Sequence, residues 1–319
     1  MSITSSRTQG ASTGRAAVTV PGSCGELVQG WTDGRLLQIT CPIDRFSTAE
    51  VSIESGRGTG VHAPGGYEKA RAAVEHTLER LGLRERRADL GVASALLRGK
   101  GMGSSTADVV AAAAATVAAA LDTLPSPELL AEVAISVEPS DGTMFSGITL
   151  FDHREGSLHM SLGPPPPLRI LVIDPGGTVD TLTFNGLGAT RTRRAMTRVP
   201  ADRIGRWTKA FHLVRDGIRS GDIEAVGRGA TESAVMHQEV LANPLFPEIL
   251  QVARDAGAVG VNRAHSGTVV GLLFPIDTDG PEAAEDMLHR RGLPVEGTLD
   301  CRLVGGGARA ASRQVARLQ

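Results

Sequence analysis

The segment Gly99-Lys100-Gly101-Met102-Gly103-Ser104-Ser105-Thr106 is the most informative stretch of this sequence. Its alternating glycines remove side chains where a main chain must approach an anion closely, and they permit unusual backbone angles. Residues 90–97 before it fit a strand, and residues 105–121 after it are rich in alanine and predict a helix. Because a helix N-terminus offers free N–H groups and a positive dipole end, this order predicts a site for a di- or triphosphate.

The same loop supplies side chains suited to a nucleotide and its metal. Lys100 adds a mobile cation, and the hydroxyl of Ser105 is a candidate ligand for the Mg²⁺ that accompanies ATP. The P-loop pattern GxxxxGK[ST] is absent, so a flexible connection capped by serine is the alternative interpretation. We expect nucleotide binding by Lys100, Gly101, Met102, Gly103, Ser104, Ser105 and Thr106.

The length of 319 residues favours two lobes or one large unit. Four successive prolines at 164–167 form a stiff connector, since they cannot join a helix or a central strand. They divide the chain into an N-terminal lobe, 16–163, which would bind ATP, and a C-terminal lobe, 168–319. The first 15 residues, rich in Ser, Thr and Gly, predict a disordered segment.

Hydrophobic periodicity places further elements on both sides of this connector. In the N-terminal lobe we expect strands at 17–20, 36–40 and 48–53, helices at 67–81 and 127–136, and a hairpin of 148–152 with 157–162. The second helix has Ser126 as its N-cap. In the C-terminal lobe, a βαβ-like order comprises strands 169–173, 259–261, 268–274 and 301–304 and helices 201–219, 223–240, 247–255 and 281–291.

Bulk composition excludes several classes of function. With 33 basic and 35 acidic residues, the net charge of -2 gives no electrostatic footprint for nucleic acid or an anionic membrane. The three cysteines cannot all pair and lack the spacing of a metal site, which favours a reducing cytoplasm. No signal peptide is evident, and the alanine-rich run 111–120 is interpreted as a buried helix, not a membrane span.

Three segments in order resemble signatures of the GHMP kinases, the family named for galactokinase, homoserine kinase, mevalonate kinase and phosphomevalonate kinase. Residues 101–107 resemble the second signature, and residues 21–27, PGSCGEL, resemble the N-terminal substrate-side motif. Residues 262–271, NRAHSGTVVG, are similar to the C-terminal motif, although that motif is richer in glycine elsewhere. The resemblance implies a two-lobed α+β fold. Its N-terminal lobe would resemble ribosomal protein S5 domain 2, its C-terminal lobe would be ferredoxin-like, and the active site would lie between them.

A narrower resemblance is to the branch of this family that phosphorylates L-threonine in cobalamin assembly. It is carried by residues 21–31, 98–102, 138–141 and 264–268. It implies that ATP, with Mg²⁺, and the hydroxylated amino acid L-threonine give O-phospho-L-threonine. Oligomeric state is left open, with a homodimer as one outcome.

Two carboxylates follow a predicted helix in Val137-Glu138-Pro139-Ser140-Asp141-Gly142. Phosphoryl transfer needs a metal bridging the phosphates and a group that orients or deprotonates the attacking hydroxyl. By resemblance, Glu138 would ligate Mg²⁺ together with Ser105, and Asp141 would be the catalytic residue facing the acceptor hydroxyl. Both acids are otherwise explained as ordinary turn residues, because Pro139 and Gly142 favour a loop.

The remaining candidate residues concern the acceptor. Glu26 lies in a glycine-flanked loop, where it either holds an ammonium group or is a solvated loop acid. His265 either binds a ligand beside backbone donors or packs under its turn. The expected acceptor-binding residues are Ser23, Glu26, His265, Ser266 and Gly267.

Other polar residues are interpreted as structural. His62, His153 and His159 lack partners at metal-site spacing, so we expect them on the surface or in structural roles. The basic run Arg191, Arg193 and Arg194 is expected to be a solvated loop.

Rival functions also remain. One is a GHMP kinase for homoserine, mevalonate or a sugar, and another is a related ATP-dependent decarboxylase. A non-catalytic nucleotide sensor is a third, although it would not need Ser105, Glu138 and Asp141 together.

Overall fold

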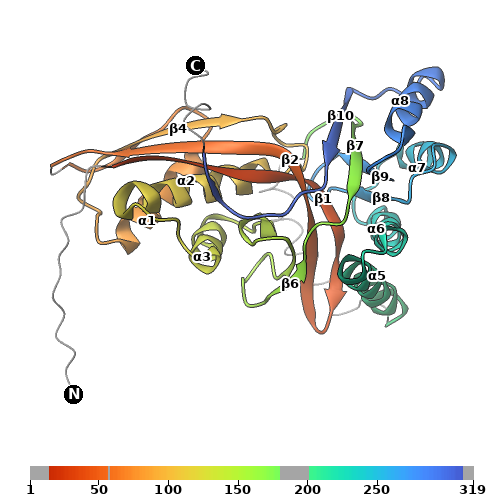
Figure 1. The fold of residues 1–319 in the computed structure, drawn as a ribbon, viewed down its shortest axis with the longest axis horizontal. Coiled ribbons are helices and arrows are strands. Elements are labelled where there is room, and N and C mark those ends of the chain that lie inside the picture. The colour runs from red at the N-terminus through yellow and green to blue at the C-terminus, as the bar shows by residue number, and fades with distance from the viewer. Residues whose placement is uncertain (1–13, 57, 180–200, 312–319) are drawn as a thin grey trace.

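Two long strands, β1 (Arg15–Thr32) and β2 (Arg35–Ile53), form an antiparallel hairpin through the centre of the molecule (Figure 1). The computed structural model describes residues 14–56, 58–179 and 201–311. Asp33 and Gly34 turn the hairpin with positive φ angles of 51° and 72°. An Asp-Gly pair suits such a two-residue turn, because its twist matches the twist of the flanking strands.

The N-terminal half places helices on one face of the sheet β1-β2-β4-β3 (Figure 1). Its elements are β3 (Val61–His62), α1 (Glu68–Arg80), β4 (Ala88–Ser94), α2 (Ser104–Leu121) and α3 (Pro127–Val137). The predicted helices are therefore confirmed to within a residue or two, and Ser126 caps α3 by accepting a 3.3 Å hydrogen bond from the Leu129 N–H. The turn η1 (Gly142–Met144) and the hairpin of β5 (Ile148–Phe151) and β6 (His159–Gly163) follow.

Helix α2 lies beneath the central hairpin. It is long and apolar enough by composition to cross a membrane, yet 78% of that stretch is buried inside the protein. Its alanines allow close approach to β1 and β2, which it contacts along its length. This confirms the interpretation of the alanine-rich run as a buried helix.

The C-terminal half forms an antiparallel sheet of order β10-β7-β9-β8. Strands β7 (Leu168–Asp174) and β8 (Gly260–Arg263) run in the same direction, and β9 (Val270–Pro275) is inserted between them. This split βαβ arrangement is typical of the ferredoxin-like fold and confirms the predicted fold class. The remaining elements are α5 (Ala201–Ser220), α6 (Ile223–His237), α7 (Phe246–Asp255), α8 (Gly280–Arg290), β10 (Gly297–Arg302) and β11 (Arg309–Ala310).

One sheet joins the two halves. Strand β8 pairs with β1 at Arg263 and Glu26, and β11 returns from the C-terminal half to pair with β1. The prolines at 164–167 connect β6 to β7, and the division of the chain there stays a prediction. Residues 1–13 of the predicted disordered segment 1–15 lie outside the described residues, as does the basic run of Arg191, Arg193 and Arg194. Arg15, at the end of that segment, instead begins β1.

Several boundaries differ from the expected ones. Strand β1 continues through Pro21 and Gly22, with register shifts between Pro21 and Ser23, Ser23 and Glu26, and Glu26 and Val28. These bulges let the strand accommodate proline and redirect its side chains. Similarly, β2 runs through Cys41 and Pro42, α6 ends before residue 240, and β10 begins at residue 297 because it pairs with the end of β7.

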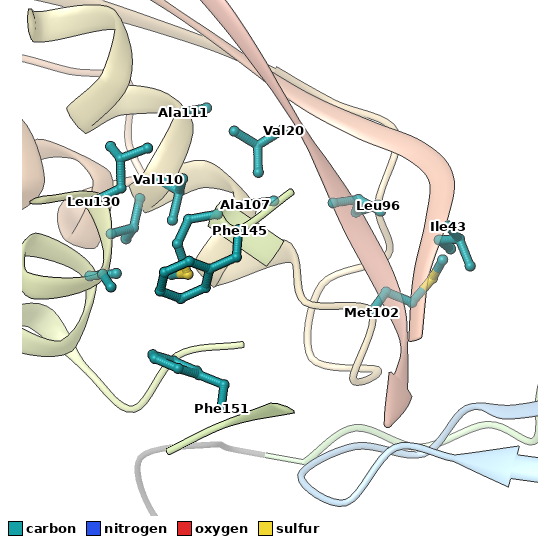
Figure 2. Packing of buried hydrophobic residues seen from close by; sticks show 14 of the residues in the cluster. Val20, Ile43, Leu96, Met102, Ala107, Val110, Ala111, Leu130, Phe145 and Phe151 are labelled. Carbon is teal, nitrogen blue, oxygen red and sulfur yellow. The ribbon is translucent and has the colours of Figure 1, made fainter. Parts of the chain in front are cut away.

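A continuous apolar core lies between the central hairpin and the N-terminal helices (Figure 2). Ala107, Val110 and Ala111 of α2 contribute to it with Phe145 and Phe151. A second cluster packs α7 and α8 against β7, β8 and β9. All three cysteines are buried and unpaired in this structure.

Candidate active site

Three loops from distant parts of the sequence are held together by main-chain hydrogen bonds. The Ser23 N–H donates to the Met102 carbonyl at 2.9 Å, and the Gly25 N–H donates to the Gly101 carbonyl at 3.1 Å. On the other side, the N–H groups of Thr268 and Val269 both donate to the Lys100 carbonyl, at 2.8 and 3.0 Å. The glycine loop is therefore clamped between the bulged part of β1 and the turn that follows β8.

This packing explains why glycines occupy the loop. Gly103 has a φ of +63°, and a Cβ there would lie 2.6 Å from Ser23 Oγ and 2.7 Å from Asp141 Oδ2. Gly101 has a φ of +87°, and its Cβ would lie 2.3 Å from that of Ala264. Any other residue would strain the backbone and displace the neighbouring loops.

Asp141 lies directly beyond the glycine loop. Its Oδ2 accepts a 3.1 Å hydrogen bond from the Ser23 hydroxyl, its Oδ1 accepts one of 3.2 Å from Gln38, and its N–H donates to the Thr106 hydroxyl at 3.2 Å. The pKa of this carboxyl is raised to about 7, mainly by burial and also by the negative charge of Glu26, while the hydrogen bonds from Gln38 and Ser23 oppose the rise. A carboxyl group with such a pKa is suited to exchanging a proton near neutral pH.

The second predicted carboxylate contacts the predicted metal-binding hydroxyl. One oxygen of Glu138 accepts a hydrogen bond from Ser105, and the other lies 2.6 Å from the Lys69 ammonium group. Glu138 is buried, and both contacting groups come from the first turns of helices, α2 and α1. Mg²⁺ is commonly held by one or two protein oxygens while phosphates and water complete its coordination, so this pair fits that ion.

A pocket of about 210 Å³ opens beside Ser105. Ser104 and Ser105 line it at the start of α2, where helical N–H groups are free to bind an anion. Its lining also includes Lys69 and Arg98, and the Arg98 guanidinium lies 4.0 Å from the centre of the Tyr67 ring. Arg98 also pairs with Asp108 at 3.2 Å. The pocket thus combines a helix N-terminus, two cations and an aromatic ring with the acidic residues Glu68 and Asp108.

Glu26 and His265 form a buried pair on the C-terminal side of the site. Glu26 Oε2 accepts hydrogen bonds of 2.9 Å from both the backbone N–H and the Nδ1 of His265. The other ring nitrogen lies 3.4 Å from the Ser233 hydroxyl, and His237 contacts the His265 carbonyl at 2.9 Å. Burial lowers the pKa of His237 well below its usual value, and His265 lowers it further. Glu26 is therefore not the solvated loop acid of the alternative interpretation.

The remaining predicted residues are placed as follows. Ser23 is fully buried and contacts Asp141, whereas Ser266 and Gly267 lie in the turn that contacts the glycine loop. The Met102 side chain belongs to the apolar core, so only its main chain faces the neighbouring loop (Figure 2). Lys100 points to carboxylates of the C-terminal half, with its ammonium group 2.8 Å from Asp174 and 2.6 Å from Glu296.

The three histidines that were expected on the surface or in structural roles also have defined environments. His153 is buried, and burial lowers its pKa to about 4, which agrees with a structural role. His62 and His159 have exposed side chains near Asp89 and Glu128.

Sequence reasoning missed Gln38 and Lys69. Gln38 interrupts the apolar run Leu36-Leu37-Gln38-Ile39, and a polar residue on a buried strand was a usable signal. Lys69 begins an ordinary amphipathic helix, and nothing in its local sequence indicates that it reaches Glu138.

Comparison with known families identifies similar proteins. Residues 68–149 match the profile of the GHMP kinases N terminal domain, and residues 214–292 match that of the GHMP kinases C terminal domain. The chain is 34% identical over 267 residues to an L-threonine kinase of Salmonella typhimurium, a match covering 81% of this chain and 83% of the relative. It is 31% identical over 283 residues to an L-threonine kinase of Citrobacter freundii, covering 88% and 93%.

Solved structures with the same fold are more distant in sequence. A homoserine kinase from Cytophaga hutchinsonii has a TM-score of 0.72 at 16% identity, covering 96% of this chain and 100% of its own. A mevalonate diphosphate decarboxylase from Staphylococcus aureus has a TM-score of 0.69 at 14% identity, covering 93% and 98%. At these identities the similarity establishes the fold.

Proposed function

The chain belongs to the GHMP kinase family, an ATP-dependent phosphotransferase family, and from this premise we propose that it phosphorylates the side-chain hydroxyl of L-threonine. The product would be O-phospho-L-threonine, and its use in cobalamin biosynthesis is part of the proposal. The observation that carries the choice of acceptor is the identity of 31–34% to two L-threonine kinases over most of both chains.

The arrangement around Asp141 supports transfer to a hydroxyl group. Ser23 and Gln38 hold its two oxygens in place, and a pKa of about 7 leaves a substantial ionised fraction at neutral pH. In the proposed mechanism, Asp141 orients the threonine hydroxyl and accepts its proton as the oxygen attacks the γ-phosphorus of ATP. The phosphorus–oxygen bond to ADP then breaks, and ADP leaves with the bonding electrons.

Nucleotide binding is assigned to the pocket at the start of α2. Main-chain N–H groups at Ser104 and Ser105 would hold phosphate oxygens, and Lys69 and Arg98 would supply positive charge. Ser105 and Glu138 would hold Mg²⁺, which neutralises charge on the transferring phosphoryl group when bound. In this structure, the Lys69 ammonium group holds the Glu138 carboxylate in position.

The buried Glu26 is proposed to recognise the acceptor. Its Oε2 is occupied by His265, so its other oxygen is the one that would meet the ammonium group of threonine. Ser266 and Gly267 follow His265 and would complete this side of the site. A cytoplasmic location and a homodimer stay predictions.

The function is tested by measuring ADP release from ATP and Mg²⁺ with L-threonine, L-serine, L-homoserine, mevalonate and galactose, and by identifying each product by mass. Threonine-dependent ADP with O-phosphothreonine is expected. Turnover of another alcohol would refute L-threonine as the acceptor but would still support a kinase. Release of carbon dioxide would indicate the related decarboxylase. ATP binding without turnover of any acceptor would favour a nucleotide sensor.

A further inference from the structure

A second pocket, of about 310 Å³, lies on the C-terminal side of the glycine loop. It is lined by the segment that follows α6, by Gly267 and Thr268 of the turn after β8, and by Arg263 at the end of β8. Among the described residues, it shares no lining residue with the pocket at the start of α2. The proposed function uses Gly267 at the edge of this pocket and gives no role to its other lining residues.

Arg263 is an unusual residue for such a position. It is only 1% exposed, and its Nη1 donates a hydrogen bond to the neutral Gln238 side chain. Within the described part of the chain its Nε has no hydrogen-bond partner, and no carboxylate comes within 4 Å of its guanidinium, which lies 5.8 Å from the centre of the Phe246 ring. The nearest acid along the paired strands, Glu26, is hydrogen-bonded to His265.

A buried guanidinium group without a counter-ion is energetically unfavourable, because burial removes the hydration of its charge. Burial lowers the pKa of Arg263 to about 10, while the charge of Glu26 opposes that change, so the group stays positive at neutral pH. Its remaining N–H groups form a planar donor set that matches the oxygens of a carboxylate or phosphate.

The rest of the pocket wall agrees with an anionic ligand. The buried Thr268 hydroxyl has no hydrogen-bond partner among the described residues, and Asn243 adds a polar side chain. None of the described residues that line the pocket is acidic, and the other walls include Val179, Leu241 and Leu245. A ligand with one oxyanion and a small apolar body fits this distribution.

The pocket wall is also connected to the glycine loop. Thr268 donates its backbone N–H to the Lys100 carbonyl at 2.8 Å, and a Cβ on Gly267 would lie 2.3 Å from Gly101 Cα. A ligand against Thr268 would therefore stabilise the turn that supports the phosphate loop.

We infer that Arg263 and Thr268 form a binding site for a small organic oxyanion, separate from the Asp141 centre and adjacent to the glycine loop. The ligand carries either a carboxylate or a phosphate monoester, since both match the free donors of the guanidinium group. The inference does not depend on the acceptor proposed above, because it rests on the pocket and on a buried guanidinium group that has no carboxylate partner among the described residues.

The site is tested by isothermal titration of the full chain without ATP, using acetate, inorganic phosphate, L-threonine and O-phospho-L-threonine in turn. We expect saturable binding of at least one of them, weakened about tenfold or more by Arg263→Gln, because hydrogen bonds to a charged group are lost. Arg228→Gln, which removes an equal charge from an exposed position on α6, should leave binding unchanged. Stronger binding of acetate than of inorganic phosphate would indicate a carboxylate ligand, and the reverse order would indicate a phosphate ligand.

A second variant guards against misfolding of the Arg263 variant. Thr268→Val keeps the shape and removes only a hydroxyl that has no protein partner, so it should fold and bind the same anion about fivefold more weakly. The same anion should raise the Tm of the wild-type chain more than that of either variant. The inference is overturned if no anion binds saturably, or if both variants bind the anion as strongly as the wild-type chain does.

Discussion

The Ser23 hydroxyl donates a 3.1 Å hydrogen bond to Asp141 Oδ2, although 118 positions separate the two residues in the sequence. Gln38 donates to the other oxygen at 3.2 Å. Both donors are neutral, so they orient the carboxylate without the charge compensation that lysine or arginine would supply. The carboxylate is therefore fixed in position while its pKa stays high enough for proton transfer near neutral pH.

Replacement of Asp141 should separate catalysis from nucleotide binding. We expect Asp141→Ala to lower kcat by about 10²- to 10⁴-fold, the usual contribution of a positioned acid or base, while the Kd for ATP changes little. Steady-state ADP release and equilibrium ATP titration measure the two quantities. Asp286→Asn, at an exposed site on α8, is the control and should leave both unchanged. Normal turnover by Asp141→Ala would refute the assignment.

The pH profile provides a second measure of the same group. Because the ionised carboxylate is the active form, kcat should rise with pH through about 7 and level off above it. The charge of Glu26 raises the pKa of Asp141, so Glu26→Gln should lower that pKa and move the rise to lower pH. The measurement is kcat against pH at saturating acceptor. An unchanged or upward-shifted midpoint in Glu26→Gln would contradict the coupling.

The sequence predicted local features of this site better than its long-range contacts. The glycine loop and α2 follow from neighbouring residues, because backbone freedom, helix propensity and the dipole act within a few positions. The pairing of Ser105 with Glu138 was expected from resemblance alone. The contact of Lys69 with Glu138 depends on how α1 packs against the end of α3, and a helical pattern does not specify it.

Local sequence signals also did not predict that the two long strands are continuous. Pro21 and Pro42 indicated the ends of strands, yet β1 and β2 continue through both because bulges absorb the missing N–H donors. Those bulges redirect Ser23 toward Asp141 and Glu26 toward His265. The departures from regular strand geometry therefore coincide with the candidate site.

Gly103 should be intolerant of any side chain. Gly103→Ala would add left-handed backbone strain and a Cβ 2.6 Å from Ser23 Oγ, so we expect a loss of about 2–4 kcal/mol in unfolding free energy and a large fall in kcat. Gly34→Ala is the matched control, since its φ is +72° and nothing lies within 4 Å of the added Cβ. It should lose only about 1–2 kcal/mol and keep its kcat. Equal effects of the two changes would contradict the steric argument.

Removal of either proposed magnesium ligand should raise the metal requirement. Ser105→Ala and Glu138→Gln each delete an oxygen ligand or its charge, so the Mg²⁺ concentration for half-maximal activity should increase about tenfold or more. A magnesium titration at fixed ATP measures this change. Ser55→Ala, at an exposed position after β2, is the control for loss of a hydroxyl. A lower kcat with an unchanged magnesium dependence would remove these residues from the metal site.

Variants of Lys100 and its partner test whether the Lys100 ammonium group binds the nucleotide or stabilises the fold. Its ammonium group lies 2.8 Å from the buried Asp174 and 2.6 Å from the exposed Glu296, and only the first contact is shielded from water. Lys100→Met should therefore lower the unfolding free energy by about 1–3 kcal/mol, because the buried oxygens of Asp174 lose their charged donor. Glu296→Gln should have little effect on stability, since an exposed ion pair contributes little.

The Lys100→Met variant also tests whether Lys100 contacts ATP directly. If the ammonium group serves mainly to join the glycine loop to the end of β7, the Kd for ATP should change less than about threefold in Lys100→Met. Chemical denaturation and ATP titration of the same preparations give both numbers. A loss of ATP affinity of about tenfold or more with unchanged stability would show that Lys100 leaves Asp174 to bind the nucleotide, as the sequence alone suggested.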